Sequence, residues 1–270
     1  MYKKAFKEAL IIILIVILII IILFPIYILI VSALMPTDDV VNKRFTIRLR
    51  KFDFSNFNFF SDIRFWKAVG LSLSSSLMLL SIRLITYTLF VIGISKLGKR
   101  SKKVILLIIL ILSFIPEFAI YLSLNKVLNK LNITNSLTPL SLVTNGFFSY
   151  FFMYNLLIHF EKSKQKYYKA MKIDNLTLWQ KIYLIYWKEM KETYILLIIF
   201  SFVSVWNDYL WPNYILSGTN DATVGIWFRQ IGQVPAGGSL LNIQSAGALV
   251  VIAIPLTVYF IFSKKIVRSV

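Results

Sequence analysis

The chain of 270 residues is too apolar for an ordinary water-soluble domain. Hydrophobic residues make up 58% of it and charged residues 16%, with a mean hydropathy of +0.73. Soluble domains carry roughly 45–50% apolar and about 25% charged residues. The net charge of +18 comes from Lys and Arg in short segments between apolar runs, which argues against a basic nucleic-acid-binding face. The absence of cysteine excludes a disulfide framework and a cysteine-ligated metal site.

Six apolar runs are each long enough to cross a membrane, because a spanning helix needs about 20 residues. They cover residues 9–34, 68–95, 104–125, 137–159, 193–216 and 243–263. The first run follows Lys3, Lys4 and Lys7, as in a signal peptide, but it exceeds the usual apolar length of about 7–15 residues and has no small-residue cleavage site. We therefore expect an all-α membrane protein with six transmembrane helices in a single domain, 1–270. We expect no interrupted spans of the kind typical of secondary transporters.

The distribution of Lys and Arg indicates the orientation of the chain. With the N-terminus inside, the inner segments hold 19 Lys and Arg residues and the outer loops hold 10. The positive-inside rule then favours both termini in the cytoplasm. Seven of the ten outer charges lie in the first outer loop, residues 35–67, which weakens this bias.

The longest inner loop, residues 160–192, has the pattern of two short helices. The stretch KYYKAMKI (166–173) predicts the first helix, and LTLWQKIYLIYWKEM (176–190) predicts the second. Asp174 and Asn175 between them are a turn signal. The second stretch has an apolar face at helical spacing, formed by Leu178, Ile182 and Ile185. We expect a cytoplasmic helix-turn-helix whose apolar side meets a partner protein or the membrane surface.

The stretch KAMKIDN (169–175) resembles the cytoplasmic signature E-A-A-x-x-D-G of the permeases of bacterial ABC importers. Two residues agree with the signature, and three replace its Glu, Ala and Gly. The replacement of Gly by Asn175 is understandable, because Asn tolerates a positive φ better than most residues. The resemblance implies that this stretch and the next residue couple the chain to an ATPase: Lys169, Ala170, Met171, Asp174, Asn175 and Leu176.

A longer match lies in the fifth apolar run. The string SFVSVWNDYLWPNYIL (201–216) resembles the fifth helix of the carbohydrate-uptake permeases, in which W-N-D-x-L-W-P is characteristic. Other segments resemble the same family in the same order, namely 32–40, 114–137, 223–230 and 247–267. The similarity thus covers nearly the whole chain. It implies a type I ABC importer permease fold with six transmembrane helices and a cytoplasmic coupling helix-turn-helix, in a bacterial cell membrane.

The resemblance also implies the partners of the chain. They are a second homologous permease, two ABC ATPase subunits, an extracytoplasmic solute-binding protein and the lipid bilayer. The sequence has no G-x-x-x-x-G-K-[ST] loop and no paired-carboxylate or Ser-His-Asp constellation, so we expect a non-enzymatic chain without a cofactor of its own. ATP and Mg²⁺ would bind to the partner ATPases, and the cargo would be a carbohydrate or a related polyol or sugar phosphate.

Charged and polar residues within the apolar runs are candidates for the translocation path, because they are costly in lipid unless they face a polar cavity or a partner. The candidates are Asn207, Asp208, Trp211, Glu117 and Arg83. An alternative places Asp208 at the outer interface, within an aromatic belt that includes Trp206 and Trp211. For Arg83, pairing with an acidic group in this permease or in the partner permease and snorkelling to the interface are both open.

Several simpler interpretations stay open. Asp174 could serve as the N-cap of the second loop helix. The loop lysines Lys162, Lys164, Lys166, Lys169 and Lys172 could bind the ATPase or anionic lipid, or only set the topology. The single histidine, His159, fits packing better than metal binding. For the whole chain, the alternatives are a permease for another solute such as glycerol phosphate, and a membrane scaffold that no longer transports.

Overall fold

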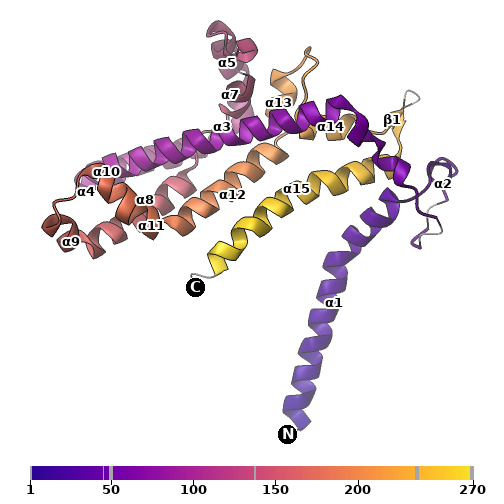
Figure 1. The fold of residues 1–270 in the computed structure, drawn as a ribbon, viewed down its shortest axis with the longest axis horizontal. Coiled ribbons are helices and arrows are strands. Elements are labelled where there is room, and N and C mark those ends of the chain that lie inside the picture. Colours follow the sequence, from indigo (N-terminus) through magenta and orange to yellow (C-terminus); the bar gives the residue numbers. More distant parts are fainter. Residues whose placement is uncertain (1, 45, 49–50, 137, 235–236, 268–270) are drawn as a thin grey trace. The chain divides into compact units, whose positions relative to one another are not determined.

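The structure, a computed structural model, describes residues 2–44, 46–48, 51–136, 138–234 and 237–267 (Figure 1). Arg50 and Leu137, which belong to the predicted first outer loop and fourth span, lie outside the described residues. The chain divides into two compact units, Met1–Trp66 with Trp227–Ile254 and Lys67–Ile226 with Pro255–Val270. The described residues are mostly helical, with one two-stranded antiparallel hairpin.

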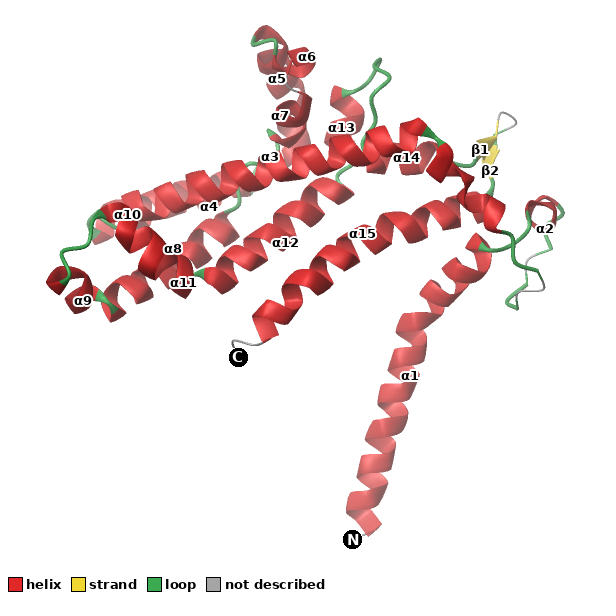
Figure 2. Ribbon diagram, viewed as in Figure 1, coloured by secondary structure: helices red, strands yellow, loops and turns green. Residues whose placement is uncertain are grey.

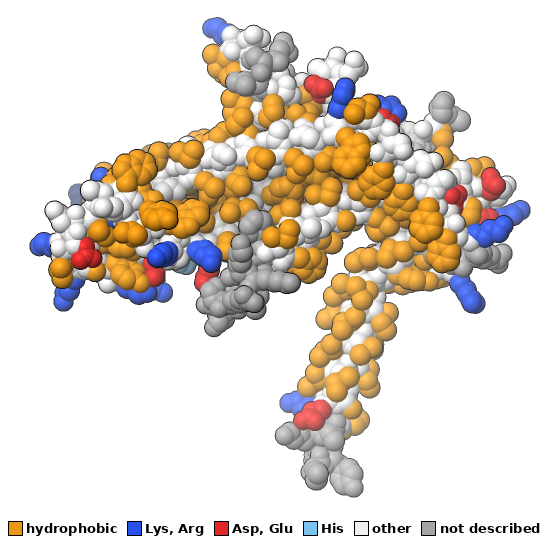
Figure 3. Space-filling model, viewed as in Figure 1, with side chains coloured by type: hydrophobic (Ala, Val, Ile, Leu, Met, Phe, Trp, Pro, Cys, Tyr) orange, Lys and Arg blue, Asp and Glu red, His pale blue; other side chains and the backbone are white. Residues whose placement is uncertain are grey.

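Three long helices correspond to the first, second and sixth predicted spans. They are α1 (Tyr2–Ala33), α3 (Ile63–Ile94) and α15 (Leu241–Val267). Within the described residues, each contains a segment long and apolar enough to cross a membrane. On α1 the Ile and Leu side chains from Leu10 to Leu23 are exposed, whereas Val31 and Ala33 in the last turn are buried. Figure 3 shows the hydrophobic surface of this helix. Such a surface is suited to lipid, and the chain has the membrane-protein fold class that its composition predicts.

The third predicted span is broken. Helix α4 (Lys99–Ser113) and helix α5 (Glu117–Lys130) together are long and apolar enough to cross, but they are bent by 92°. Pro116 is the N-cap of α5, and proline disfavours helical backbone at the residue before it. The expectation of uninterrupted spans is therefore wrong here.

The fourth and fifth predicted spans are also interrupted. In the fourth, α6 (Ile133–Ser136) and α7 (Thr138–Val143) precede α8 (Tyr150–Lys166). In the fifth, α12 (Lys191–Asn207) ends before Asp208, and α13 (Leu210–Ile215) follows. By length and composition the described residues contain three candidate spans, or four if the bent pair is one, so six spans stay a prediction.

The first unit has a buried amide cluster as its polar centre. Asn56, in the 3-10 helix η1 (Phe54–Ser61), donates through Nδ2 to the carbonyls of Ala33 and Met35, at 2.9 Å each. Asn242 of α15 donates to Asn56 Oδ1 at 2.6 Å. These bonds join three chain segments that are far apart in sequence. Short elements complete the unit: α2 (Thr37–Val41), β1 (Gln233–Val234) and β2 (Gly238–Ser239).

The second unit is built on α8. Helices α4 and α12 pack against it, and α3 contributes the fully buried Tyr87 to the same core. Leu156 of α8 and Leu197 of α12 are also fully buried there. A separate apolar cluster around Leu142 and Leu216 joins α7 to the segment after α13 and to α14 (Val224–Gln230). These two clusters position both parts of the candidate site.

Candidate functional site

The predicted helix-turn-helix is present between residues 166 and 190. Helix α9 (Tyr168–Ile173) is followed by a turn and by a continuous helical stretch, α10 (Leu178–Lys181), η2 (Ile182–Tyr186) and α11 (Trp187–Glu189). In the turn, Asp174 N–H donates to Ala170 O at 2.9 Å, and Leu176 N–H donates to Met171 O at 3.3 Å. Asn175 has a φ of 43°, as its place in the signature predicts.

The N-cap of the second loop helix is Thr177, so the capping role considered for Asp174 is wrong. Thr177 Oγ1 accepts from Gln180 N–H at 3.4 Å, and Gln180 Oε1 accepts from Thr177 N–H at 2.8 Å. This reciprocal pair is a capping box, and its T-x-x-Q pattern is visible in the sequence. Asp174 instead follows α9 as an exposed carboxylate, and it forms no ion pair with any described residue.

One face of the loop packs on the core of the second unit. Figure 2 shows the loop helices α9 and α11 beside α8. Tyr186 is buried against Phe160 of α8, with 4.1 Å between the ring centroids, and its hydroxyl donates to Met171 Sδ at 3.6 Å. Met190, at the junction of α11 and α12, is 1% exposed. Ile182 and Ile185 of the predicted apolar face are partly buried in the same cluster. The loop is therefore held firmly by the helices that it connects.

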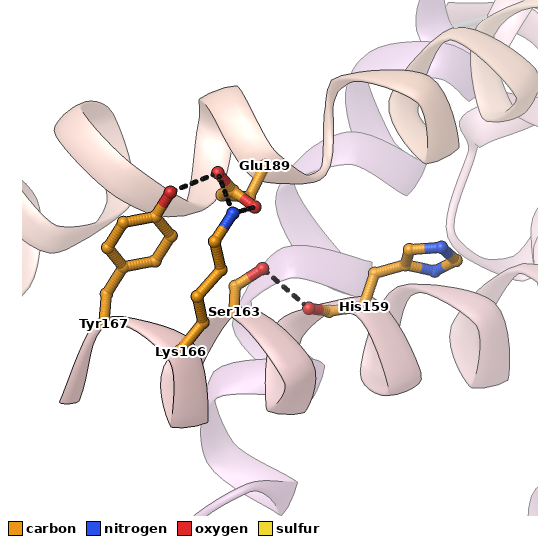
Figure 4. Close-up of polar contacts among 5 residues, drawn as sticks. All are labelled: His159, Ser163, Lys166, Tyr167 and Glu189. Atoms are coloured by element: carbon orange, nitrogen blue, oxygen red, sulfur yellow. Dashed lines mark hydrogen bonds and ion pairs between the residues drawn. The ribbon is translucent and has the colours of Figure 1, made fainter. Parts of the chain in front are cut away.

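Polar contacts also join the end of α8 to α11, as Figure 4 shows. Tyr167 Oη donates to Glu189 Oε1 at 2.6 Å, and Lys166 Nζ lies 3.2 Å from Glu189 Oε2. The Tyr167 hydroxyl, followed by Lys166, lowers the pKa of the Glu189 carboxyl. His159 on α8 is exposed, and its Nδ1 lies 2.8 Å from Asn155 O. Within the described residues no three His, Cys, Asp or Glu side chains gather as a metal site.

The opposite face of the loop leaves large apolar side chains at the surface. Ile173 is 82% exposed, and Trp179 and Tyr183 are 74% exposed each. The signature residues Lys169, Ala170, Asp174 and Asn175 are exposed beside them, whereas Met171 is buried. Exposed aromatic side chains next to polar ones are typical of a surface that binds another protein. The π-helical turn η2 within this stretch was not predicted, and such turns are frequent at functional sites.

A second group of candidates meets at the interruptions of the third, fourth and fifth spans. Asn145, between α7 and α8, donates to Glu117 Oε2 at 3.4 Å, and its amide also lies close enough to the Asp208 carboxylate to interact with it. The backbone N–H groups of Tyr209 and Trp211 also lie close to the Asp208 carboxylate. Two carboxylates from different spans are thus joined through an amide that the sequence analysis did not select. The signal for Asn145 was a polar Asn-Gly pair inside an otherwise apolar run.

Arg83 is 5% exposed and lies close to this group without pairing to an acid. Its Nη1 donates to Ser201 Oγ at 2.9 Å, and its Nη2 donates to the carbonyl of Gly146, the residue after Asn145. It forms no ion pair within the described part of the chain. Among the described residues, Arg83 therefore links α3 to α12 and to the interruption between α7 and α8. Pairing with an acidic group of a second permease stays a prediction.

The remaining candidates have different surroundings. Trp211 is fully buried, donates from Nε1 to Ser141 O at 2.9 Å and lies 4.8 Å from the Tyr121 ring. Trp206 is 1% exposed and stacks on Phe202, so both tryptophans are covered by other side chains of the chain. The interfacial position considered for Asp208 stays a prediction. Asn207, at the end of α12, is exposed. The structure therefore brings Glu117 and Asp208 close together. Arg83 is bonded to Gly146, the residue after Asn145, and Trp211 is packed in the interior.

The sequence of the chain matches a known protein family over residues 88–270, described as the binding-protein-dependent transport system inner membrane component. The match includes the whole loop and the segment with Asn145 and Asp208. The chain belongs to this family. It is a multi-pass permease of the cell membrane, and as part of a binding-protein-dependent system it acts with a solute-binding protein and an ATPase.

Known permeases are similar to this one over most of their length. A probable ABC transporter permease protein of Mycoplasma genitalium is 24% identical over 261 residues, which cover 92% of this chain and 81% of the relative. The lactose transport system permease protein LacG of Rhizobium radiobacter is 22% identical over 259 residues, covering 92% and 89% of the two chains. The family resemblance drawn from the signature and from the W-N-D-x-L-W-P string is thus confirmed.

Proposed function

We propose that this permease couples ATP hydrolysis by partner ATPase subunits to the import of a carbohydrate or a related polyol. The observation that carries the proposal is the two-sided loop at 160–192. One side is packed on α8 and α12, and the other leaves Trp179 and Tyr183 exposed. Exposure of these aromatic side chains to water costs free energy, and binding to a partner protein would remove that exposure.

In this account the loop binds one ATPase subunit, with Lys169, Ala170, Asp174, Asn175 and Leu176 at the contact. ATP and Mg²⁺ bind to the two ATPases. A movement of the loop reaches the core through Tyr186 and Met190, because both are buried among the helices that the loop connects. The permease then shifts between an inward-open and an outward-open state, and ATP changes the relative free energy of the two states.

Helix α12 is the rigid connection between the loop and the opposite end of the fifth span. It starts at Lys191, directly after the loop, and ends at Asn207, next to Asp208. Its 17 residues extend about 25 Å at 1.5 Å per residue. A displacement at the loop end therefore reaches the group of Asn145, Glu117 and Asp208 without passing through a flexible segment.

The chemistry of that group favours a hydroxyl-rich cargo. Carboxylate and amide side chains accept and donate the hydrogen bonds that sugar hydroxyls make. Arg83 donates from Nη1 to Ser201 and from Nη2 to Gly146, whereas its Nε has no partner among the described residues. The two carboxylates of the group would repel a phosphate. The lactose-transport relative and the W-N-D-x-L-W-P string support the same class. A neutral sugar or polyol is therefore preferred to a sugar phosphate or glycerol phosphate.

The complete assembly in this proposal has both termini of the chain in the cytoplasm. A second homologous permease completes the path, and an extracytoplasmic solute-binding protein delivers the cargo. The lysine-rich loop lies on the cytoplasmic side, consistent with the positive-inside rule.

Co-purification with the cognate ATPase tests the proposal and separates it from a scaffold function. The double substitution Trp179→Ala/Tyr183→Ala removes the exposed aromatic surface of the loop. Phe54→Ala is the matched control, because Phe54 is equally exposed at 69% but lies in the first unit. We expect the double variant to lose the ATPase while the control retains it. Failure of the wild-type chain to retain any ATPase would favour the scaffold.

A further inference from the structure

A groove of about 950 Å³ lies between α4 and α8 in the second unit. Its position differs from that of the exposed loop face and from that of the Glu117–Asn145–Asp208 group. Its lining includes Lys99, Lys103, Lys164, Leu107, Leu110 and Tyr154. The proposed transport function does not account for this groove.

One end of the groove is strongly basic. The lining holds four lysines, three from the first turns of α4 and Lys164 from α8, but only one acidic residue, Glu161. Glu161 forms an ion pair with Lys102, so Lys99, Lys103 and Lys164 have no acidic partner among the described residues. This end therefore presents uncompensated positive charge to a ligand.

The other end of the groove is apolar and aromatic. Leu107 and Leu110 lie further along α4, with Leu110 about 17 Å from Lys99 at 1.5 Å per residue. Tyr150 and Tyr154, on the first turns of α8, stack with 5.4 Å between their ring centroids. The Lys102–Glu161 pair joins the start of α4 to the end of α8, and Tyr150 N–H donates to Ser113 Oγ at 3.2 Å between the start of α8 and the end of α4. The two helices therefore run in opposite directions.

The two ends together fit an amphipathic anion. We propose that the groove binds an anionic phospholipid, with its phosphate at Lys99, Lys103 and Lys164 and an acyl chain along Leu107, Leu110 and Tyr154. Basic pockets between transmembrane helices bind acidic lipid headgroups. Tyrosines are enriched at the membrane interface, where their rings meet both environments. A small soluble anion would leave the apolar end uncovered.

The membrane position of the groove follows from α4. This helix, with α5, belongs to a helix pair apolar enough to cross the bilayer, and its basic residues are confined to its first turns. The groove therefore runs from headgroup depth into acyl-chain depth. It also contacts Tyr168, the first residue of α9, so a bound lipid touches the loop helix that carries the family signature.

Lipid retention by the purified chain tests this site. The full-length protein in neutral detergent is titrated with phosphatidylglycerol and, separately, with phosphatidylcholine of the same acyl chains. Bound lipid is then counted by native mass spectrometry. We expect one phosphatidylglycerol molecule to be retained at least about 10-fold more strongly than phosphatidylcholine, because lysines near a lipid headgroup favour the anionic form.

A matched pair of charge variants locates the binding. Lys99→Gln/Lys103→Gln removes two groove lysines four residues apart on one helix. Lys126→Gln/Lys130→Gln removes two exposed lysines at the same spacing on α5, outside the groove. We expect phosphatidylglycerol retention to fall about 10-fold or more in the first variant and to stay unchanged in the second. Equal losses in both variants would overturn the site.

Two further measurements address other occupants. Glycerol phosphate and inorganic phosphate share the charge of the headgroup but lack acyl chains, so neither should displace the lipid at millimolar concentration. Displacement by either would identify an anion site and overturn the lipid proposal. In the assembled importer, cross-linking of a reactive group at Lys103 to the second permease, with loss of the lipid, would instead identify a subunit interface and also overturn it.

Discussion

Thr177 and Asp174 lie three residues apart in the loop but have different roles. Thr177 closes the capping box on Gln180, whereas Asp174 is exposed beside the signature residues. Loss of a Thr N-cap costs about 1 kcal/mol of helix stability. Thr177→Ala should therefore speed amide hydrogen exchange in α10, measured by mass spectrometry on the purified chain.

Asp174→Ala is the control for this prediction. It should leave exchange in α10 unchanged, because Asp174 does not cap the helix, yet it should weaken retention of the ATPase. Faster exchange in Asp174→Ala than in Thr177→Ala would contradict the capping assignment.

Glu189 makes the attachment of the loop sensitive to acid. Its pKa in the folded chain is lowered, first by the Tyr167 hydroxyl and then by Lys166. The stabilisation is therefore fully present above the ordinary Glu pKa of about 4.3 and is lost as the pH falls through the lower, folded-state pKa. The effect is small, because the site is exposed to solvent.

Tyr167→Phe tests this contact. Without the hydroxyl, the pKa of Glu189 should rise toward its ordinary value, as followed by NMR titration of the labelled carboxyl carbon in micelles. Lys164→Gln is the control, since Lys164 makes no ion pair with Glu189. An unchanged titration in Tyr167→Phe would show that the neighbouring lysines Lys166 and Lys162 set the pKa of Glu189 without the hydroxyl.

At the scale of the elements, hydropathy and local motifs predict different parts of this chain. The continuous helices α1, α3 and α15 follow from long apolar runs, and the loop turn follows from Asp174-Asn175. The interruptions at Pro116 and Asp208 were missed, because a span-length window averages over a break of a few residues. Pro116 itself was a visible local signal for a helix boundary.

The candidate site could be predicted only in part from the sequence. Glu117, Asp208 and Arg83 stand out as charges in apolar runs, and the structure brings the first two together. Asn145 is uncharged and does not stand out, yet it joins both carboxylates. Which polar groups meet depends on the packing of α5, α7 and α13, and single-sequence periodicity carries no information about such contacts between distant elements.

The junction of α11 and α12 should be the firmest attachment of the loop to the span. Met190 is buried there among Tyr186, Tyr194 and the side chains of α8. Truncation of a buried Met to Ala costs about 2–5 kcal/mol. Met190→Ala should lower the thermal unfolding midpoint of the purified chain and uncouple ATP hydrolysis from uptake.

Lys191→Ala, at the next and exposed position, is its control and should leave both quantities unchanged. A Met190→Ala variant with wild-type coupling would show that movement of the loop reaches the span by another route.

At the scale of the whole molecule, the loop and the Asn145 group lie at opposite ends of one helix, α12. In this proposal the ATPase acts at the first end and the cargo passes the second. Substitutions at the two ends of α12 should therefore have different effects on ATPase binding and on uptake. Loop variants should lose the ATPase, whereas Asp208 variants should keep the ATPase and lose uptake.

Uptake by the complete importer in proteoliposomes tests this account most directly. The measurement follows ATP-dependent entry of a labelled disaccharide delivered by the cognate binding protein, with wild type, Asp208→Leu and Asp174→Lys. We predict uptake by wild type, loss of uptake with the ATPase still bound in Asp208→Leu, and loss of both in Asp174→Lys. Wild-type uptake in both variants would contradict the account.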